Sequence, residues 1–234
     1  MRLFAQALCG LLLGSIAAPV VAQSSSGVVV ELYTSQGCSS CPPADAYLAE
    51  LAQDHGVIAL ALHVDYWDYI GWKDSFANGK FTDRQKDYAL AGGSSTIYTP
   101  QMIVGGMDRV EGSNPEKVEG SIRRQQSAQP MVVLQLMRSG DQVVIHATAQ
   151  TALSGPLVVQ LVRYRPTETV TIKHGENAGR TITYTNIVTS WARIAEWPGT
   201  DDLDLSLPLL GADPVVVIVQ QPGPGMILAA SVLR

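Results

Sequence analysis

The chain has 234 residues, of which 46% are apolar and only 16% are charged, with a formal net charge of −5. This composition supports a substantial buried core and is unlike that of a disordered chain. The acidic balance argues against a nucleic-acid partner, because phosphate binding needs a surplus of Lys and Arg.

The first residues have the pattern of a secretory signal peptide. Arg2 precedes an apolar run over residues 3–21, and Val20, Val21 and Ala22 offer a cleavage site. A retained membrane anchor is the alternative, but the cleavage pattern and the polar residues 24–27 favour removal of residues 1–22. We therefore expect a periplasmic or secreted protein whose mature chain does not span a membrane.

Removal of the signal peptide also removes Cys9, which leaves Cys38 and Cys41 as the cysteines of the mature chain. Disulfides form and persist in an oxidising compartment. A disulfide that closes so short a loop removes little entropy from the unfolded chain and so stabilises a fold little. The pair is therefore better placed for chemistry than for stability.

The first half of the mature chain alternates strand and helix patterns. Gly105 and Gly106 form a hairpin signal between two short strands, and Asn114 and Pro115 are typical of a helix start. The predicted strands are residues 28–33, 57–64, 101–104 and 107–111, and the predicted helices are residues 38–54, 82–90 and 114–126.

A polar linker at residues 125–130 precedes a change of periodicity. The remaining segments predict strands, which together are typical of an all-β sandwich or barrel. The predicted strands are residues 131–137, 142–150, 157–164, 169–173, 180–191, 203–207, 215–220 and 226–233. This half has no residue set typical of catalysis, and residues 174–177 are interpreted as a hairpin turn. We therefore expect it to dock on the first half or present a partner, with a supporting role in recognition or positioning.

Cys38 and Cys41 form a C-x-x-C motif after a strand and at a predicted helix start, which is a thioredoxin-type redox signal. The partial positive charge of a helix N-terminus stabilises a thiolate. We expect Cys38 to be the exposed attacking residue. Cys41, one turn into the helix, should be the resolving residue that expels a mixed disulfide.

The dipeptide Thr99-Pro100 precedes a hydrophobic strand, as does the cis-proline that packs against the C-x-x-C motif in thioredoxin-like folds, so we expect a cis peptide bond there. Together with the C-x-x-C motif it predicts an α/β thioredoxin-like domain at residues 23–128. The all-β, sandwich-like domain would then occupy residues 129–234.

Four strings of this sequence resemble one family, the DUF1223 family of secreted proteins in the thioredoxin-like superfamily. They are VELYTSQGCSSCPPAD at residues 30–45, HVDYWDYIGWKD at 63–74, YTPQMIVGG at 98–106 and GENAGRTITY at 175–184. The resemblance implies a thioredoxin-like fold and a thiol–disulfide role, and it names no substrate.

Glu31 is an acid inside an apolar strand, where burial without a partner would be costly. It is a candidate proton shuttle beneath the cysteines, although an outward-facing position is the alternative, because one residue of offset turns a strand side chain to the other face. The aromatic loop at residues 65–77 is interpreted as packing, with a substrate shelf as the alternative. His63 and Asp65 are better explained by structural hydrogen bonds than by metal binding.

The leading hypothesis is an exported thiol–disulfide oxidoreductase that acts on protein thiols and is recycled by an unidentified redox partner. A binding module that keeps the pair only as a staple is the alternative, and a Cu(I) carrier that uses both thiolates is a third possibility. Structural zinc would need two more ligands, so no metal or other cofactor is expected.

Overall fold

The computed structural model describes residues 25–209 and 211–234, so the predicted signal peptide at residues 1–22 lies outside the described residues. In this part of the chain, no helix has both the length and the hydropathy that a membrane span requires. The helices are α1 (Pro42–Leu51), α2 (Gly79–Ala91) and α3 (Pro115–Gln126), with a short 3-10 helix, η1 (Asp68–Ile70). The strands are β1 (Ser25–Ser26), β2 (Val28–Thr34), β3 (Val57–His63), β4 (Gln101–Val104), β5 (Asp108–Glu111), β6 (Val132–Ser139), β7 (Gln142–Ala149), β8 (Leu157–Thr171), β9 (Thr181–Trp197), β10 (Leu203–Pro208), β11 (Val215–Gln220) and β12 (Ile227–Leu233).

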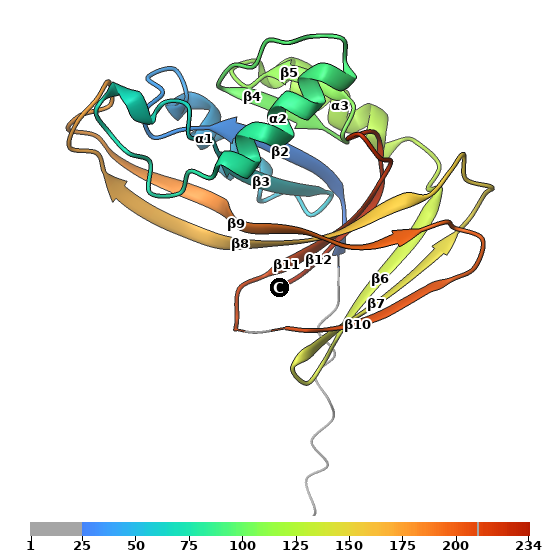
Figure 1. The fold of residues 1–234 in the computed structure, drawn as a ribbon. Coiled ribbons are helices and arrows are strands. Elements are labelled where there is room, and N and C mark those ends of the chain that lie inside the picture. Colours follow the sequence, from blue (N-terminus) through green and yellow to red (C-terminus); the bar gives the residue numbers. More distant parts are fainter. Residues whose placement is uncertain (1–24, 210) are drawn as a thin grey trace, which may run out of the picture.

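A curved sheet of nine described strands runs through the molecule in the order β1-β12-β11-β8-β9-β3-β2-β4-β5 (Figure 1). β2 and β3 are parallel, whereas β4 and β5 add antiparallel strands at one edge. β3 meets β9 where Ala61 pairs with Ile187, and the side chain of Asn186 donates a hydrogen bond to the carbonyl oxygen of Ala59. This junction joins strands from both halves of the chain.

Three further strands form a second sheet in the order β10-β7-β6. Its buried face packs on β11 and β12, and the contact places Ile145 in the same apolar cluster as Val217 and Val219. Along β6, buried and exposed residues alternate, as expected for a strand with one face in the core and one in solvent.

Helices cover both faces of the β2–β3 region. Val30 and Leu32 lie in the apolar cluster that includes residues of α1 and α3, whereas Tyr33 lies in the cluster that includes Phe81 and Tyr88 of α2. Side chains alternate between the two faces of a strand, so consecutive residues of β2 face different helices. The continuous apolar run of β2 follows from this burial on both faces.

The predicted fold class, an α/β thioredoxin-like domain followed by an all-β sandwich-like domain, is wrong. The described chain is mostly β, with three α-helices around a nine-stranded sheet that takes strands from both halves. The physical reason is that β9 pairs with the edge of β3, whose backbone N–H and C=O groups need partners. Periodicity could not reveal this contact, because it reports which faces of a segment are apolar and not which distant segment covers them.

Several local predictions also shift. The strands predicted at residues 157–164 and 169–173 form one long strand, β8, which pairs with β9 as a hairpin arm. The second helix begins at Gly79, earlier than residue 82, because the side chain of Asn78 caps it by accepting from Lys80 N.

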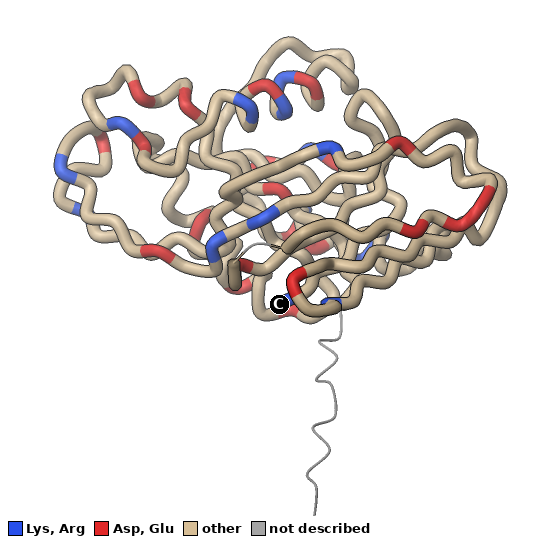
Figure 2. The backbone as a smooth tube through the Cα atoms, turned by 60° about the horizontal axis from the view of Figure 1, so that its bottom comes forward, with Lys and Arg blue, Asp and Glu red and all other residues tan. Residues whose placement is uncertain are grey.

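Figure 2 shows basic and acidic residues interspersed along the chain, with no single basic face in that view.

A buried ion pair fixes α2 to the sheet. Glu31 is fully buried, and Arg84 binds both of its carboxylate oxygens through Nε at 2.7 Å and Nη2 at 2.8 Å. The hydroxyls of Tyr33 and Tyr88 donate two more hydrogen bonds to the same carboxylate. The guanidinium also lies 3.9 Å from the centre of the Trp191 ring. Glu31 is thus a fully satisfied structural charge.

Arg84→Met should be strongly destabilising because it leaves Glu31 buried without its cation, a change that costs about 3–5 kcal/mol. Urea unfolding would measure the loss. Lys86→Met is the matched control, since Lys86 pairs with Asp83 on the surface, where such pairs contribute about 1 kcal/mol or less. Equal losses for the two variants would show that the buried pair contributes no more than a surface one.

Candidate functional site

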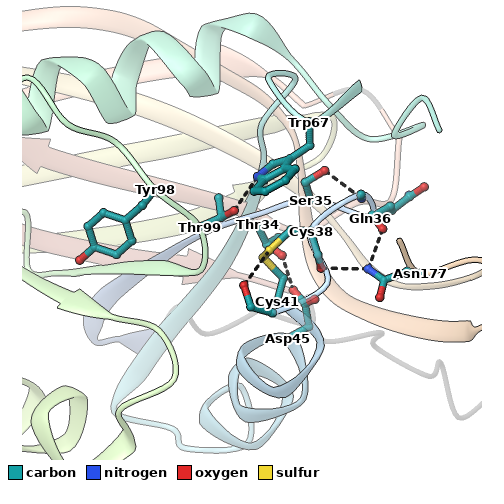
Figure 3. Close-up of a disulfide and its surroundings, with 12 residues drawn as sticks. Thr34, Ser35, Gln36, Cys38, Cys41, Asp45, Trp67, Tyr98, Thr99 and Asn177 are labelled. Atoms are coloured by element: carbon teal, nitrogen blue, oxygen red, sulfur yellow. Dashed lines mark hydrogen bonds between the residues drawn. A yellow bond between two sulfur atoms is a disulfide. The ribbon is translucent and has the colours of Figure 1, made fainter. Parts of the chain in front are cut away.

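The cysteine pair lies in the turn between β2 and α1, and Cys38 and Cys41 form a disulfide (Figure 3). The helix begins at Pro42 with Cys41 as its N-cap, so the expectation that the helix starts at Cys38 is wrong. Pro42 and Pro43 explain the late start, because proline lacks the N–H that would continue a helix backwards. The pair nevertheless sits at the positive end of α1.

Both cysteines are fully buried, which corrects the expectation that Cys38 is exposed. The cover comes from the aromatic loop, where Trp67 and Ile70 pack over Gly37. A Cβ on Gly37 would lie 3.1 Å from Cδ1 of Ile70 and 3.2 Å from Cβ of Trp67, so a larger side chain there would push against the loop. Exposed Ser40 adds a hydroxyl 3.4 Å from the sulfur of Cys38.

The Thr99–Pro100 peptide bond is cis, as predicted. Thr99 accepts a hydrogen bond at 2.7 Å from Nε1 of Trp67, and this bond ties the cover to the loop before β4. A Cβ on Gly112 would lie 3.0 Å from Cβ of Pro100 and 3.3 Å from Cβ of Ala44, so Gly112 lies between Pro100 and the first turn of α1. The fold therefore brings Thr99 and Pro100 to the side of the cysteine turn.

Glu31 does not join this site. It lies on the face of β2 that packs against α2, where Arg84 holds it, whereas α1 covers the other face. The one-residue offset from Cys38 does turn the side chain to the other face of the sheet, but the side chain is fully buried there, so the outward-facing alternative is also wrong.

Asp45 is the acid that lies by the cysteines, and sequence reasoning missed it. It sits four residues after Cys41 on the same face of α1, and its Oδ1 accepts a hydrogen bond of 2.8 Å from the hydroxyl of Thr34 (Figure 3). Its other oxygen, Oδ2, is buried without a hydrogen-bond partner. Burial raises the pKa of Asp45 to about 7, against the opposing attraction of His63 and the hydrogen bond from Thr34. The i, i+4 spacing from Cys41 was the available signal.

A buried His63–Asp74 pair lies close to Asp45. Nδ1 of His63 is 2.7 Å from Oδ2 of Asp74, and the same oxygen accepts a hydrogen bond of 2.8 Å from the backbone N–H of Gln36. Burial acts to raise the pKa of Asp74, but His63 and the backbone N–H donors of Gln36 and Phe76 outweigh it and hold the pKa below its ordinary value. Asp74 therefore stays ionised, and its hydrogen bond with the backbone of Gln36 holds the residues just before Cys38.

The side chains of His63 and Asp65 do not converge on a common point where a metal ion could bind, because each is hydrogen-bonded to a different residue. Asp65 accepts a hydrogen bond of 2.6 Å from Thr82 on α2, whereas His63 turns toward Asp74. Across residues 25–209 and 211–234, no group of three or more His, Cys, Asp or Glu side chains could hold a metal ion.

The second half of the chain also enters the site, which the sequence did not predict. Asn177, in the turn between β8 and β9, is buried, and its Nδ2 donates to the carbonyl oxygens of Gln36 at 3.0 Å and Cys38 at 2.9 Å (Figure 3). The string GENAGRTITY contained this residue, but a polar residue in a turn gives no sign of the distant carbonyl groups that it will meet.

Trp67→Ala should expose the disulfide and increase its rate of reduction by a phosphine by roughly 10-fold or more, because local opening of the cover would no longer be needed. Thr99→Val, which removes only the hydrogen-bond acceptor, should give a smaller increase. Thiol trapping and mass spectrometry measure the rates. Leu90→Ala, an exposed site on α2, is the control. An unchanged rate in Trp67→Ala would mean that another segment limits access.

Asp45→Asn should change how stability depends on pH. An acid whose pKa is raised in the folded state takes up a proton on folding, so wild-type stability should fall as the pH rises from about 4 to about 7. The variant lacks this slope and should match the wild type near pH 4. At pH 8 it should be more stable by up to about 4 kcal/mol.

Urea unfolding with the disulfide intact would measure both pH profiles, with the exposed Asp83→Asn as control. Parallel profiles for wild type and Asp45→Asn would show that Asp45 is an ordinary ionised carboxylate.

Comparisons with known proteins agree with this architecture. A model of the DUF1223 family, described as a protein of unknown function, matches residues 29–220. The crystal structure of protein AGR_C_4864 from Agrobacterium tumefaciens is 32% identical, with a TM-score of 0.77, and the match covers 89% of this chain and 94% of that chain. A search among curated proteins finds no match. Because the family match spans most of the sequence, the resemblance is confirmed, and this chain belongs to the DUF1223 family.

Proposed function

We propose that this protein exchanges disulfides with protein thiols, using Cys38 and Cys41 as its redox pair. The observation that carries the proposal is a disulfide at the N-terminus of α1 with the buried carboxyl group of Asp45 four residues beyond Cys41. The short disulfide loop contributes little stability. Three apolar clusters already supply a core, so stability alone gives no reason for the pair.

The chemistry begins when a substrate thiolate attacks the sulfur of Cys38. The Cys38–Cys41 bond breaks, a substrate–Cys38 disulfide forms, and the electron pair leaves on the sulfur of Cys41. Asp45, with a pKa of about 7, donates its proton to that leaving thiolate. A second substrate thiolate then attacks the bound substrate sulfur, which forms the substrate disulfide and releases Cys38 as a thiolate.

Two electrons have then passed from substrate thiols to the pair, and the same steps run in reverse when the reduced pair meets a substrate disulfide. Either direction needs a dithiol or disulfide partner to restore the starting state. The leader-like residues 1–22 and the disulfide support a location in the periplasm or outside the cell, where disulfides persist.

One observation favours the alternative of a redox-inert binding module. Both cysteines are fully buried, and a protein substrate cannot reach Cys38 until the cover over Gly37 moves. A Cu(I) carrier would likewise require the pair to be reduced and uncovered, because the thiolates are the metal ligands.

Thiol exchange with a model dithiol peptide tests the proposal on the chain from residue 23 to residue 234. Cys38→Ser should lower exchange by roughly 100-fold or more, because it removes the attacked sulfur. Cys41→Ser, mixed with the oxidised disulfide form of the peptide, should instead accumulate a mixed disulfide, because the Cys38 thiolate breaks the peptide disulfide and no resolving thiol remains in the protein. Asp45→Asn should slow exchange by roughly 100-fold while both cysteines stay titratable.

A wild-type protein whose thiols titrate after chemical reduction, but which neither oxidises nor reduces the peptide, would favour the binding module. A mixed disulfide through Cys41 in a Cys38→Ser variant would reverse the assigned roles. Tight Cu(I) binding by the reduced pair without peptide exchange would favour the carrier.

A further inference from the structure

We propose that Asn177 is a positioning residue of the redox pair and that it favours the disulfide over the dithiol. The inference rests on the proposed function only in requiring that Cys38 and Cys41 cycle between these two states. It gives the β8–β9 hairpin, which belongs to the second half of the chain, a direct part in the redox site.

The side chain of Asn177 is buried and fully hydrogen-bonded. The residue is 2% exposed, and its two amide hydrogens satisfy two carbonyl groups of the cysteine turn. Its Oδ1 faces the other way and accepts a hydrogen bond from Nη1 of Arg180 at 3.3 Å. Each polar atom of the side chain therefore has a partner, which fixes its orientation.

The hairpin turn that carries Asn177 is itself held in place. Gly175 and Gly179 have φ values of 76° and 83°, a left-handed conformation that favours glycine. A Cβ on Gly175 would lie 3.3 Å from Cβ of Trp72, so the turn packs directly on the aromatic loop. The ring of His174 lies 6.3 Å from that of Trp72.

Gln36 also takes part in holding the cysteine turn, through hydrogen bonds of its backbone and its side chain. Its backbone N–H donates to Asp74, its carbonyl oxygen accepts from Asn177, and its side-chain Oε1 accepts from Nε1 of Trp72 at 2.8 Å. Its Nε2 donates to the hydroxyl of Ser75 at 3.2 Å. Gln36, two positions before Cys38, is thus hydrogen-bonded both to the aromatic loop and to the β8–β9 turn.

The consequence concerns the reduced state. These hydrogen bonds involve no sulfur, so they can persist when the disulfide opens and can keep the backbone turn from Cys38 to Cys41 in place. Two thiols held close together re-form their disulfide in preference to mixed disulfides, since positioning raises their effective concentration. Loss of the Asn177 amide would leave the Cys38 carbonyl oxygen held by the Cys41 N–H at 3.3 Å and no longer by the β8–β9 turn, which would lower that concentration.

The test is the equilibrium of the pair with reduced and oxidised glutathione, measured on the chain from residue 23 to residue 234. Asn177→Ala should lower the equilibrium constant for disulfide formation by roughly 10-fold, which corresponds to about 30 mV. Asn177→Asp, which keeps the shape but directs an acceptor at two carbonyl oxygens, should lower it at least as much.

Asn186→Gly is the matched control. Asn186 also donates to a buried-strand carbonyl, that of Ala59, and glycine accepts its φ of 49° without strain. It should cost stability in urea unfolding and leave the redox equilibrium unchanged. If Asn177→Ala does not fold, Trp72→Phe, which removes the bond to Gln36 from the other side, should shift the equilibrium in the same direction.

The outcomes separate the two proposals. A wild-type pair that glutathione cannot bring to a measurable equilibrium, and that does not exchange with a dithiol peptide, would overturn the proposed function. A wild-type pair that equilibrates, with an unchanged constant in a folded Asn177→Ala or Trp72→Phe variant, would overturn the positioning role alone. An equal shift in Asn186→Gly would overturn it as well, since the effect would then follow from stability.

Discussion

The junction between β3 and β9 is the contact on which the rest of the structure depends. Ala61 pairs with Ile187 there, and the ring of Tyr184 lies 5.0 Å from that of His63. This contact makes one sheet from both halves of the chain and closes the apolar cluster that contains residues of β3, β8 and β11. It also brings the β8–β9 arm to the end of β3, where its turn can reach Cys38.

The polar groups around the cysteine turn divide into two kinds. Gln36, Asp74 and Asn177 are buried with hydrogen-bond partners, and a satisfied buried network rigidifies what it contacts. Oδ2 of Asp45 and Nε2 of His63 are the buried side-chain atoms without a partner among the described residues. Such atoms cost about 1–3 kcal/mol each. The unpartnered oxygen of Asp45 is the atom on which the proposed proton transfer rests.

Local features of the site could be predicted from the sequence, because they depend on neighbouring residues. The Cys38–Cys41 pair, the strand before it and the cis bond at Pro100 each have a short-range pattern. Local patterns could not give the face of β2 on which Glu31 lies, because one residue of offset reverses it. They also missed the acid at Asp45, which an i, i+4 spacing from Cys41 would have indicated.

The long-range features could not be predicted from periodicity. The nine-stranded sheet and the contact of Asn177 with Cys38 join residues that are more than a hundred positions apart. Their signal in the sequence is an apolar strand whose edge needs a pairing partner or a polar turn residue, and many partners would satisfy either one. The expectation that the second half supports recognition or positioning could therefore not name Asn177 or the carbonyl groups that it contacts.

Access and positioning of the disulfide are assigned to different parts of the fold. On one side, the ring of Trp67 is tied to Thr99 by one side-chain hydrogen bond, and the neighbouring Tyr69 is 81% exposed. On the other side, Asn177 and Asp74 hold the turn through buried hydrogen bonds to its backbone. Segments with few buried contacts open at lower free-energy cost than buried networks do. Opening should therefore begin at Trp67, which would uncover the sulfur of Cys38 while the backbone that positions it stays in place.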